Sequence, residues 1–159
     1  MIKIRHIEGT KFEATNEKEI IIVDTTKYSP VEFFITGLAN CTLYDVVDLA
    51  KRNNTPTKEA IIEVEFKRKE TLPKIFTEFH FIYKISSSAD NLTAKKWVLS
   101  SLETYCSTIN TIRNTSKIYY TIIHNNETIA YKETILSGGD EFKFEELEDD
   151  GVGCSCCHV

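Results

Sequence analysis

The longest helical pattern of the sequence runs from Ser29 to about residue 54, and it limits the folds that the chain can adopt. Ser29 is the expected N-cap, Pro30 takes the first helical position, and Glu32 completes a capping box with Ser29. Side chains at helical spacing form one face, which consists of Phe34, Leu38, Cys41 or Thr42, Asp45 and Leu49. We therefore expect Cys41 to face packed neighbours.

Strand patterns precede and follow this helix. The expected elements, in order, are strands at residues 2–8, 11–14 and 19–24, the long helix, strands at 60–69 and 75–85, a helix from 92 to 105, a short helix at 107–114, and strands at 117–124 and 128–136. Ser107 is the expected cap of the short helix. In the strand at 75–85, His80 falls in the phase opposite to Phe79 and Phe81, so we expect it to be solvated. This order of elements predicts an α+β fold.

The composition is that of an ordinary globular protein. Of 159 residues, 42% are hydrophobic and 27% are charged, and the length suits one domain with a sizeable core. A net charge of -5 argues against nucleic acid as a partner. Because no apolar run approaches the length of a membrane span and the first residues show no signal-peptide core, we expect a cytoplasmic protein whose thiols stay reduced.

The five cysteines are distributed unevenly. Cys41 and Cys106 lie within the two long helical patterns, whereas the other three crowd the last six residues. A disulfide framework would spread its cysteines through loops, so this distribution argues against one. A reduced pair in apolar helices is a candidate for thiol chemistry, although free cysteine is also a small apolar residue that is often buried.

Beyond Ser137 the sequence becomes acidic and rich in glycine and cysteine. We expect a folded domain over residues 1–136 and an acidic, cysteine-rich mobile tail over residues 137–159. The tail contains soft donors suited to Zn²⁺ or Cu⁺, namely Cys154, Cys156, Cys157 and His158. Three other interpretations stay open: lipidation of the paired cysteines, thiol exchange with Cys41 and Cys106, and a tail without a dedicated role.

Three stretches of the sequence resemble one known family, the OsmC/Ohr family of osmotically inducible and organic hydroperoxide resistance proteins. Residues 29–47 (Ser-Pro-Val-Glu, an apolar stretch with Cys41, then Asp-Val-Val) are similar to its first cysteine helix. Residues 67–77 (Lys-Arg-Lys-Glu, then Pro and Phe-Thr) look like its middle hairpin, and residues 102–107 (Leu-Glu-Thr-Tyr-Cys-Ser) like its second cysteine helix. The resemblance runs from about residue 2 to residue 124, and Ser-Pro-x-Glu is similar to a less characterised OsmC-like branch.

The resemblance implies both a fold and an activity. The fold would be α+β, with long central helices packed by bent antiparallel sheets in an intertwined homodimer whose active sites lie at the subunit interface. The activity would be that of a thiol peroxidase without a required cofactor. The Cys41 thiolate would attack a hydroperoxide and become a sulfenic acid, Cys106 would condense with it to a disulfide, and a dithiol reductant would reopen that bond.

The residues that would support the Cys41 thiolate depart from the family pattern. The peroxidase branches have a Glu directly after the helix Pro, but here Val31 occupies that position and the acid is Glu32. Arg5 and Arg68 are both candidates for the activating cation, and we favour Arg68 because it falls in the apolar phase of its strand. The alternative hypothesis is a non-catalytic OsmC-like protein that binds a small apolar ligand at the dimer interface.

Overall fold

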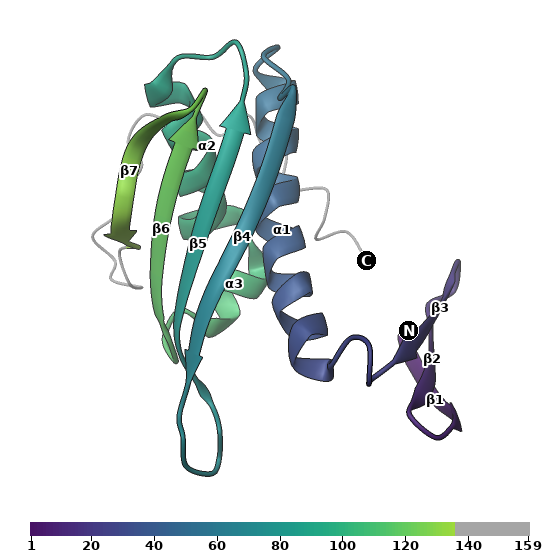
Figure 1. Cartoon of the computed structure of the whole chain (residues 1–159). Coiled ribbons are helices and arrows are strands. Elements are labelled where there is room, and N and C mark those ends of the chain that lie inside the picture. Colours follow the sequence, from purple (N-terminus) through teal and green to yellow (C-terminus); the bar gives the residue numbers. More distant parts are fainter. Residues whose placement is uncertain (136–159) are drawn as a thin grey trace. The chain divides into compact units, whose positions relative to one another are not determined.

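The computed structural model describes residues 1–135, which fall into two compact units, one of residues 1–37 and one that starts at Leu38. The strands are β1 (Lys3–Glu8), β2 (Lys11–Thr15), β3 (Ile20–Asp24), β4 (Glu59–Arg68), β5 (Phe76–Ser86), β6 (Lys117–His124) and β7 (Glu127–Thr134). The helices are α1 (Pro30–Arg52), α2 (Asn91–Ser100), the π-helix η1 (Ser101–Tyr105) and α3 (Ser107–Ile112). The α+β class predicted from the sequence is confirmed (Figure 1).

The first unit contains a three-stranded antiparallel sheet of order β1-β2-β3 and the first turns of α1. Gly9, with a φ of 50°, makes the turn between β1 and β2, in a region of backbone conformation that favours glycine. At the start of α1 the Ser29 backbone N–H donates to Glu32 Oε2 at 2.6 Å, and the Glu32 backbone N–H donates to Ser29 Oγ at 3.2 Å. The predicted capping box is therefore present.

The second unit contains a four-stranded sheet of order β4-β5-β6-β7. Its strand pairs are antiparallel except β5 and β6, which are parallel. The chain crosses over between these two strands through α2, η1 and α3, which is the kind of connection that parallel neighbours require. The sheet is thus mixed, where the family resemblance implied antiparallel sheets.

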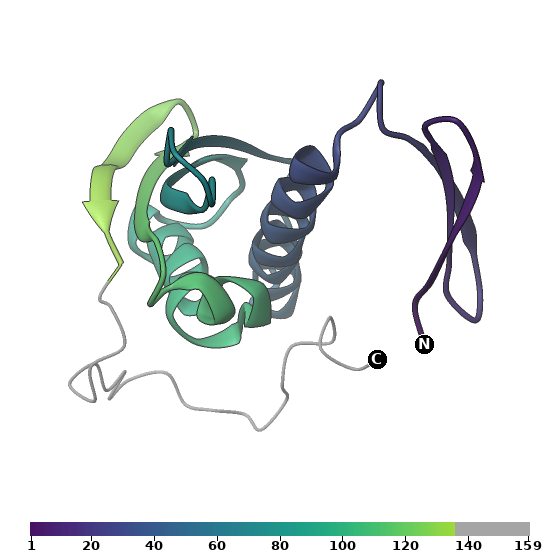
Figure 2. The ribbon, with the colours of Figure 1, turned by 90° about the horizontal axis from the view of Figure 1, so that it is seen from below.

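The core of the second unit lies on one face of this sheet, the face that carries α2 and α3 (Figure 2). From Phe79 onward, alternate residues of β5 are at most 3% exposed, which places Phe79 and Phe81 together on the buried face as the strand periodicity indicates. The other buried apolar residues of the sheet and of α2 are Ile85, Ile118, Tyr120, Ile122, Ala130, Ala94, Trp97 and Val98.

The opposite phase of β5 is not uniformly solvated, and the prediction for His80 is wrong. This side chain is buried, its Nε2 lies 2.9 Å from Thr121 Oγ1, and its Nδ1 lies 3.1 Å from a carboxylate oxygen of Glu65. Residues on β4 and β6 flank His80 on both sides, so the neighbouring strands cover a position that strand periodicity alone assigns to solvent.

Helix α1 is long and apolar enough to cross a membrane by length and composition, with a mean hydropathy of 1.2 over 18 residues. The core helix of a soluble protein passes the same test. Four residues at a spacing of four are at most 2% exposed and form one packed ridge of the helix: Leu38, Thr42, Val46 and Ala50. This ridge packs within the second unit, as it would in a core helix.

His124 ends β6 in a buried polar cluster. Its Nδ1 lies 2.7 Å from Asn91 Oδ1, an atom that can only accept, so Nδ1 carries the proton. The Ser87 hydroxyl, 2.9 Å from Nε2, is placed to donate to the other nitrogen. The geometry therefore suits a neutral imidazole, and burial lowers the pKa of His124 although the carboxylates of Asp90 and Glu127 act to raise it.

We expect this histidine to make stability depend on pH. Because the pKa of His124 is lower in the folded chain, the unfolded chain binds a proton first as the pH falls below about 6.5. The free energy of unfolding should therefore be highest above that pH and should decrease toward about pH 5. Urea unfolding from about pH 7 to pH 5 should show this decrease in the wild type and a smaller one in His124→Gln; equal slopes in the two proteins would contradict it.

Candidate thiol site

The structure brings the two predicted cysteines together. Cys41 lies half-buried on α1, and Cys106 lies fully buried between η1 and α3, at the N-cap of α3. Both thiols are free, and they are hydrogen bonded to one another. Ser107, the expected cap, is instead the first residue of α3, because the helix begins one residue earlier than the capping pattern indicates.

Thr108 is the third member of the site, and the sequence did not single it out. Its hydroxyl oxygen lies 3.2 Å from Cys106 Sγ, and both its hydroxyl and its backbone N–H are hydrogen-bond partners of Cys41. The Cys41 sulfur is therefore surrounded by groups that can donate, namely one thiol, one hydroxyl and one amide. A thiolate accepts hydrogen bonds and cannot donate them, so this surrounding favours the ionised form.

The two thiols are shifted in opposite directions. Burial acts to raise the pKa of Cys41, but the hydrogen bonds from Cys106 and Thr108 outweigh it, and the pKa is lowered. For Cys106 burial is the largest effect, and the neighbouring Cys41 adds to it, so the pKa of Cys106 is raised. The site thus separates its sulfurs into one that ionises more readily and one that retains its proton.

A buried polar network lies next to Cys41. The Thr42 hydroxyl is 2.6 Å from the Tyr83 hydroxyl and 2.8 Å from Ser101 Oγ, and the Ser101 hydroxyl donates to Asp45 Oδ2 at 2.8 Å. All four side chains are at most 2% exposed. The network joins α1, β5 and η1, so it fixes the helix that bears Cys41 against the segment that leads to Cys106.

The π-helix η1 sets the position of Cys106. The Cys106 backbone N–H donates to the carbonyl oxygen of Ser101 at 2.9 Å, a bond that spans five residues instead of four. π-helical turns are rare and are frequent at functional sites. Ser101 is therefore held by the buried network at one end of the turn, and Cys106 emerges at the other.

The predicted supporting residues have other contacts within the chain. The Glu32 carboxylate accepts hydrogen bonds from the hydroxyl and the backbone N–H of Ser29, and these two bonds lower the pKa of this carboxyl. Arg5 pairs with Glu13 across β1 and β2 at 2.8 Å. The action of these two residues on Cys41 stays a prediction.

Arg68, the favoured cation, is exposed at the end of β4. Its Nε donates to the carbonyl oxygen of Lys74 at 2.8 Å, and its guanidinium lies over the Phe76 ring, 5.3 Å from the centroid. A bulge between Lys67 and Arg68 breaks the alternation on which its inward phase depended. Its role as the activating residue therefore also stays a prediction.

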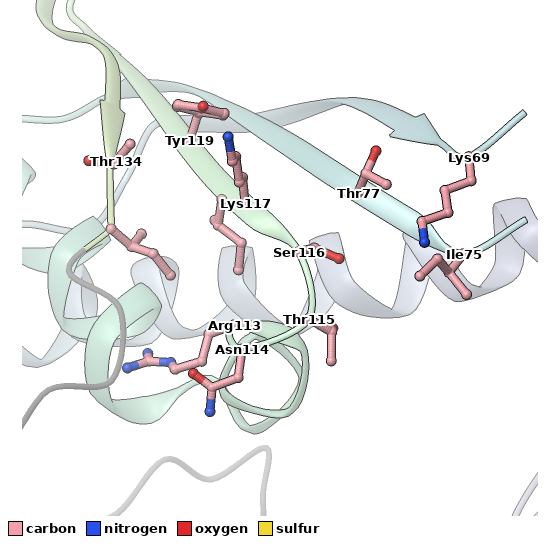
Figure 3. Close-up of a pocket in the computed structure, with 12 residues that line it drawn as sticks. Lys69, Ile75, Thr77, Arg113, Asn114, Thr115, Ser116, Lys117, Tyr119 and Thr134 are labelled. Carbon is pink, nitrogen blue, oxygen red and sulfur yellow. The ribbon is translucent and has the colours of Figure 1, made fainter.

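A groove of about 800 Å³ lies beside the ends of β5 and β6 and does not include either cysteine (Figure 3). Lys69, Arg113 and Lys117 line it, and none of its lining residues within positions 1–135 is a carboxylate. Within residues 1–135 no group of three His, Cys, Asp or Glu side chains could hold a metal ion. The predicted metal ligands Cys154, Cys156, Cys157 and His158 lie outside the described residues.

The fold and the sequence are similar to those of known proteins. The model of a family described as OsmC-like protein matches residues 23–121. A hypothetical protein from Aquifex aeolicus VF5 superposes with a TM-score of 0.69 at 20% identity over 79% of this chain and 96% of that chain. An OsmC-like protein from Mycoplasma pneumoniae gives 0.68 at 17% identity, over 78% and 95% of the two chains.

An organic hydroperoxide resistance protein from Elizabethkingia anophelis superposes with a TM-score of 0.59 at 14% identity, over 79% of this chain and 96% of that chain. Identities this low establish a shared fold and leave the activity to be argued from the site. No curated protein sequence matches the chain.

Proposed function

The chain belongs to the OsmC-like protein family, and on that premise we propose that it is a thiol-dependent peroxidase that reduces organic or small hydroperoxides. The observation that carries the proposal is the asymmetric pair of thiols. Cys41 is half-buried and has a lowered pKa, whereas Cys106 is fully buried beside it and has a raised pKa. A nucleophile that must meet peroxide and a partner that acts only afterwards need these two different environments.

The proposed reaction has three steps. The Cys41 thiolate bonds to one peroxide oxygen, the O–O bond breaks, and the other oxygen leaves as an alcohol after it takes up a proton, so that Cys41 becomes a sulfenic acid. Cys106 Sγ then bonds to Cys41 Sγ, the S–O bond breaks, and the Cys106 proton leaves with the hydroxyl group as water. A dithiol reductant reduces the disulfide to two thiols and is itself oxidised to a disulfide.

In this reaction Thr108 stabilises the Cys41 thiolate, as the sequence analysis expected of an arginine. Its two donors and the Cys106 thiol stabilise the negative charge that Cys41 must carry before it attacks. Consumption of cumene hydroperoxide by the reduced, full-length chain, compared with that of Cys41→Ser, tests the proposal. Unchanged consumption would favour the alternative of a non-catalytic protein that binds a small apolar ligand.

We also propose that the chain acts as a homodimer, because one face of the N-terminal sheet is apolar and exposed. The register of β1, β2 and β3 places six residues on this face, with one histidine as the sole polar side chain: Ile4, His6, Phe12, Ala14, Ile21 and Val23. Ile4 and Ile21 are 60% and 57% exposed. Large exposed apolar surfaces on soluble proteins mark interfaces, and a second copy of the chain is the occupant that the family fold favours.

We expect sedimentation equilibrium at micromolar concentration to give twice the chain mass of 18.2 kDa. Placing a charge on the apolar face with Ile4→Lys or Ile21→Lys should raise the dimer dissociation constant by about tenfold or more. The matched control is Ile22→Lys, because Ile22 is also 57% exposed but pairs with Glu13 on the opposite face. Equal effects of all three substitutions, or a monomeric wild type, would contradict this interface.

A further inference from the structure

Arg113 is a buried charge that the proposed reaction does not use. It follows α3 as its C-cap, and its side chain is 11% exposed. Its Nη2 donates to the carbonyl oxygens of Leu102 at 2.6 Å and Glu103 at 3.1 Å, and its Nη1 lies 3.7 Å from Glu103 Oε2. The Glu103 side chain is 6% exposed, so the ion pair is shielded from water. A guanidinium is rarely buried unless its position is specified by such partners.

The carbonyls that Arg113 binds belong to the π turn. In an α-helix the carbonyl of Leu102 would accept from the backbone N–H of Cys106, four residues on. Here the Cys106 N–H donates to Ser101 instead, which leaves the Leu102 carbonyl without that partner. Arg113 supplies the missing donor, in the way that basic side chains satisfy the last carbonyls of a helix.

Arg113 therefore links the two helices that meet at Cys106, and we call this helix junction the Cys106 corner. One arm of the corner is η1, which ends at Tyr105, and the other is α3, which begins at Ser107. Arg113 extends from the far end of α3, where its own N–H donates to Ile109, back to the carbonyls of η1. Its guanidinium is directed away from Lys69 and Thr77 on the other side of the groove (Figure 3). The described polar contacts of its guanidinium are thus all made to η1.

We infer that Arg113 is a positioning residue for disulfide formation, which holds Cys106 at the distance and direction from which it attacks the oxidised Cys41. The inference rests on the proposed function and assigns Arg113 to its second step. Attack on a sulfenic acid requires the incoming sulfur to approach along the S–O bond, so the rate depends on how the Cys106 corner is held. The first step uses Cys41, with Thr108 and the Cys106 thiol as donors, and among the described residues Arg113 has no hydrogen bond or ion pair with any of these three side chains.

The test separates these two steps in the full-length chain. In Arg113→Lys the charge remains, but a single ammonium cannot reproduce the planar fork that binds two carbonyls and a carboxylate. After one equivalent of cumene hydroperoxide, peptide mass spectrometry with dimedone present measures how oxidised Cys41 divides between the sulfenic acid adduct and the disulfide with Cys106. We expect Arg113→Lys to form the disulfide about tenfold more slowly and to accumulate the adduct, with a much smaller change in the rate of Cys41 oxidation, because the two Thr108 donors to Cys41 remain.

The matched control is Arg52→Lys, because Arg52 is paired with Asp48 on α1. In this variant the ratio of sulfenic acid adduct to disulfide should equal that of the wild type. If the role of Arg113 is purely structural, Arg113→Lys should lower the melting temperature without changing the ratio of adduct to disulfide. If Arg113→Lys does not fold, Glu103→Gln decides, because it removes the ion pair and should slow the disulfide in the same direction. Disulfide formation at the wild-type rate in the folded variant overturns the inference alone, whereas a wild type whose Cys41 resists peroxide overturns the proposed function with it.

Discussion

Substituting Cys41 by serine is expected to reduce peroxide consumption by roughly a thousandfold or more. A serine hydroxyl is barely ionised at neutral pH, whereas the Cys41 thiol has a lowered pKa and three surrounding donors. The donors that stabilise a thiolate cannot make a hydroxyl into a comparable nucleophile, because none of the hydrogen-bond partners described for Cys41 is a general base. The measurement is the initial rate of cumene hydroperoxide loss with dithiothreitol as reductant.

Cys106→Ser is the matched control, because it changes the second sulfur by the same atom. Its first equivalent of peroxide should still be consumed, since the Cys41 thiolate remains, but Cys41 should then stop as a sulfenic acid. Excess peroxide should carry that sulfenic acid on to the sulfinic acid, which mass spectrometry detects. Loss of the first turnover in Cys106→Ser to the same extent as in Cys41→Ser would contradict the separate roles of the two thiols.

Local signals in the sequence predicted the elements of the fold well. The start of α1 follows from Ser29, Pro30 and Glu32, whose capping interactions involve residues close in sequence and so can be read without tertiary information. The face of β5 that contains Phe79 and Phe81 follows from period-two alternation for the same reason.

The features that shape the thiol site depend on contacts between distant segments. The π turn before Cys106 begins at Ser101, which is hydrogen bonded to Thr42 and Asp45, more than fifty positions earlier in the chain, and no local pattern indicates these contacts. Arg68 was favoured from strand phase, which a bulge interrupts. Pairing of the cysteines was expected from the family resemblance rather than from spacing, and the structure supplies the contact that spacing could not.

Thr108 and Arg113 left weaker signals. Thr108 lies two residues after Cys106, near enough for its hydroxyl to reach that sulfur, but threonine at such a position is too common to be diagnostic. Arg113 looks in the sequence like an ordinary cation at the end of a short helix. Its burial, and the two carbonyls it binds, become apparent only once η1 and α3 are folded against one another.

The second large effect is expected for stability, at the contact between Thr42 and Tyr83. The Tyr83 side chain is fully buried, and its hydroxyl has one described partner, the Thr42 hydroxyl at 2.6 Å. Thr42→Val keeps the shape of the side chain but leaves that phenol unsatisfied, which should lower the free energy of unfolding by about 1–3 kcal/mol. Tyr83→Phe should cost about 1 kcal/mol or less, because Thr42 keeps its bond to Ser101.

The double variant with Thr42→Val and Tyr83→Phe distinguishes the cost of leaving the Tyr83 hydroxyl without a partner from the cost of lost packing. Once Tyr83 is phenylalanine no phenol remains to be orphaned, so Thr42→Val should cost about 1–2 kcal/mol less in that background than in the wild type. Tyr120→Phe is the matched control, since its hydroxyl donates to Glu133 at 2.6 Å and not to Thr42, and its combination with Thr42→Val should be additive within about 0.5 kcal/mol. Urea unfolding at one fixed chain concentration measures both cycles, and equal coupling in the two would show that the Thr42–Tyr83 bond does not hold α1 against the sheet.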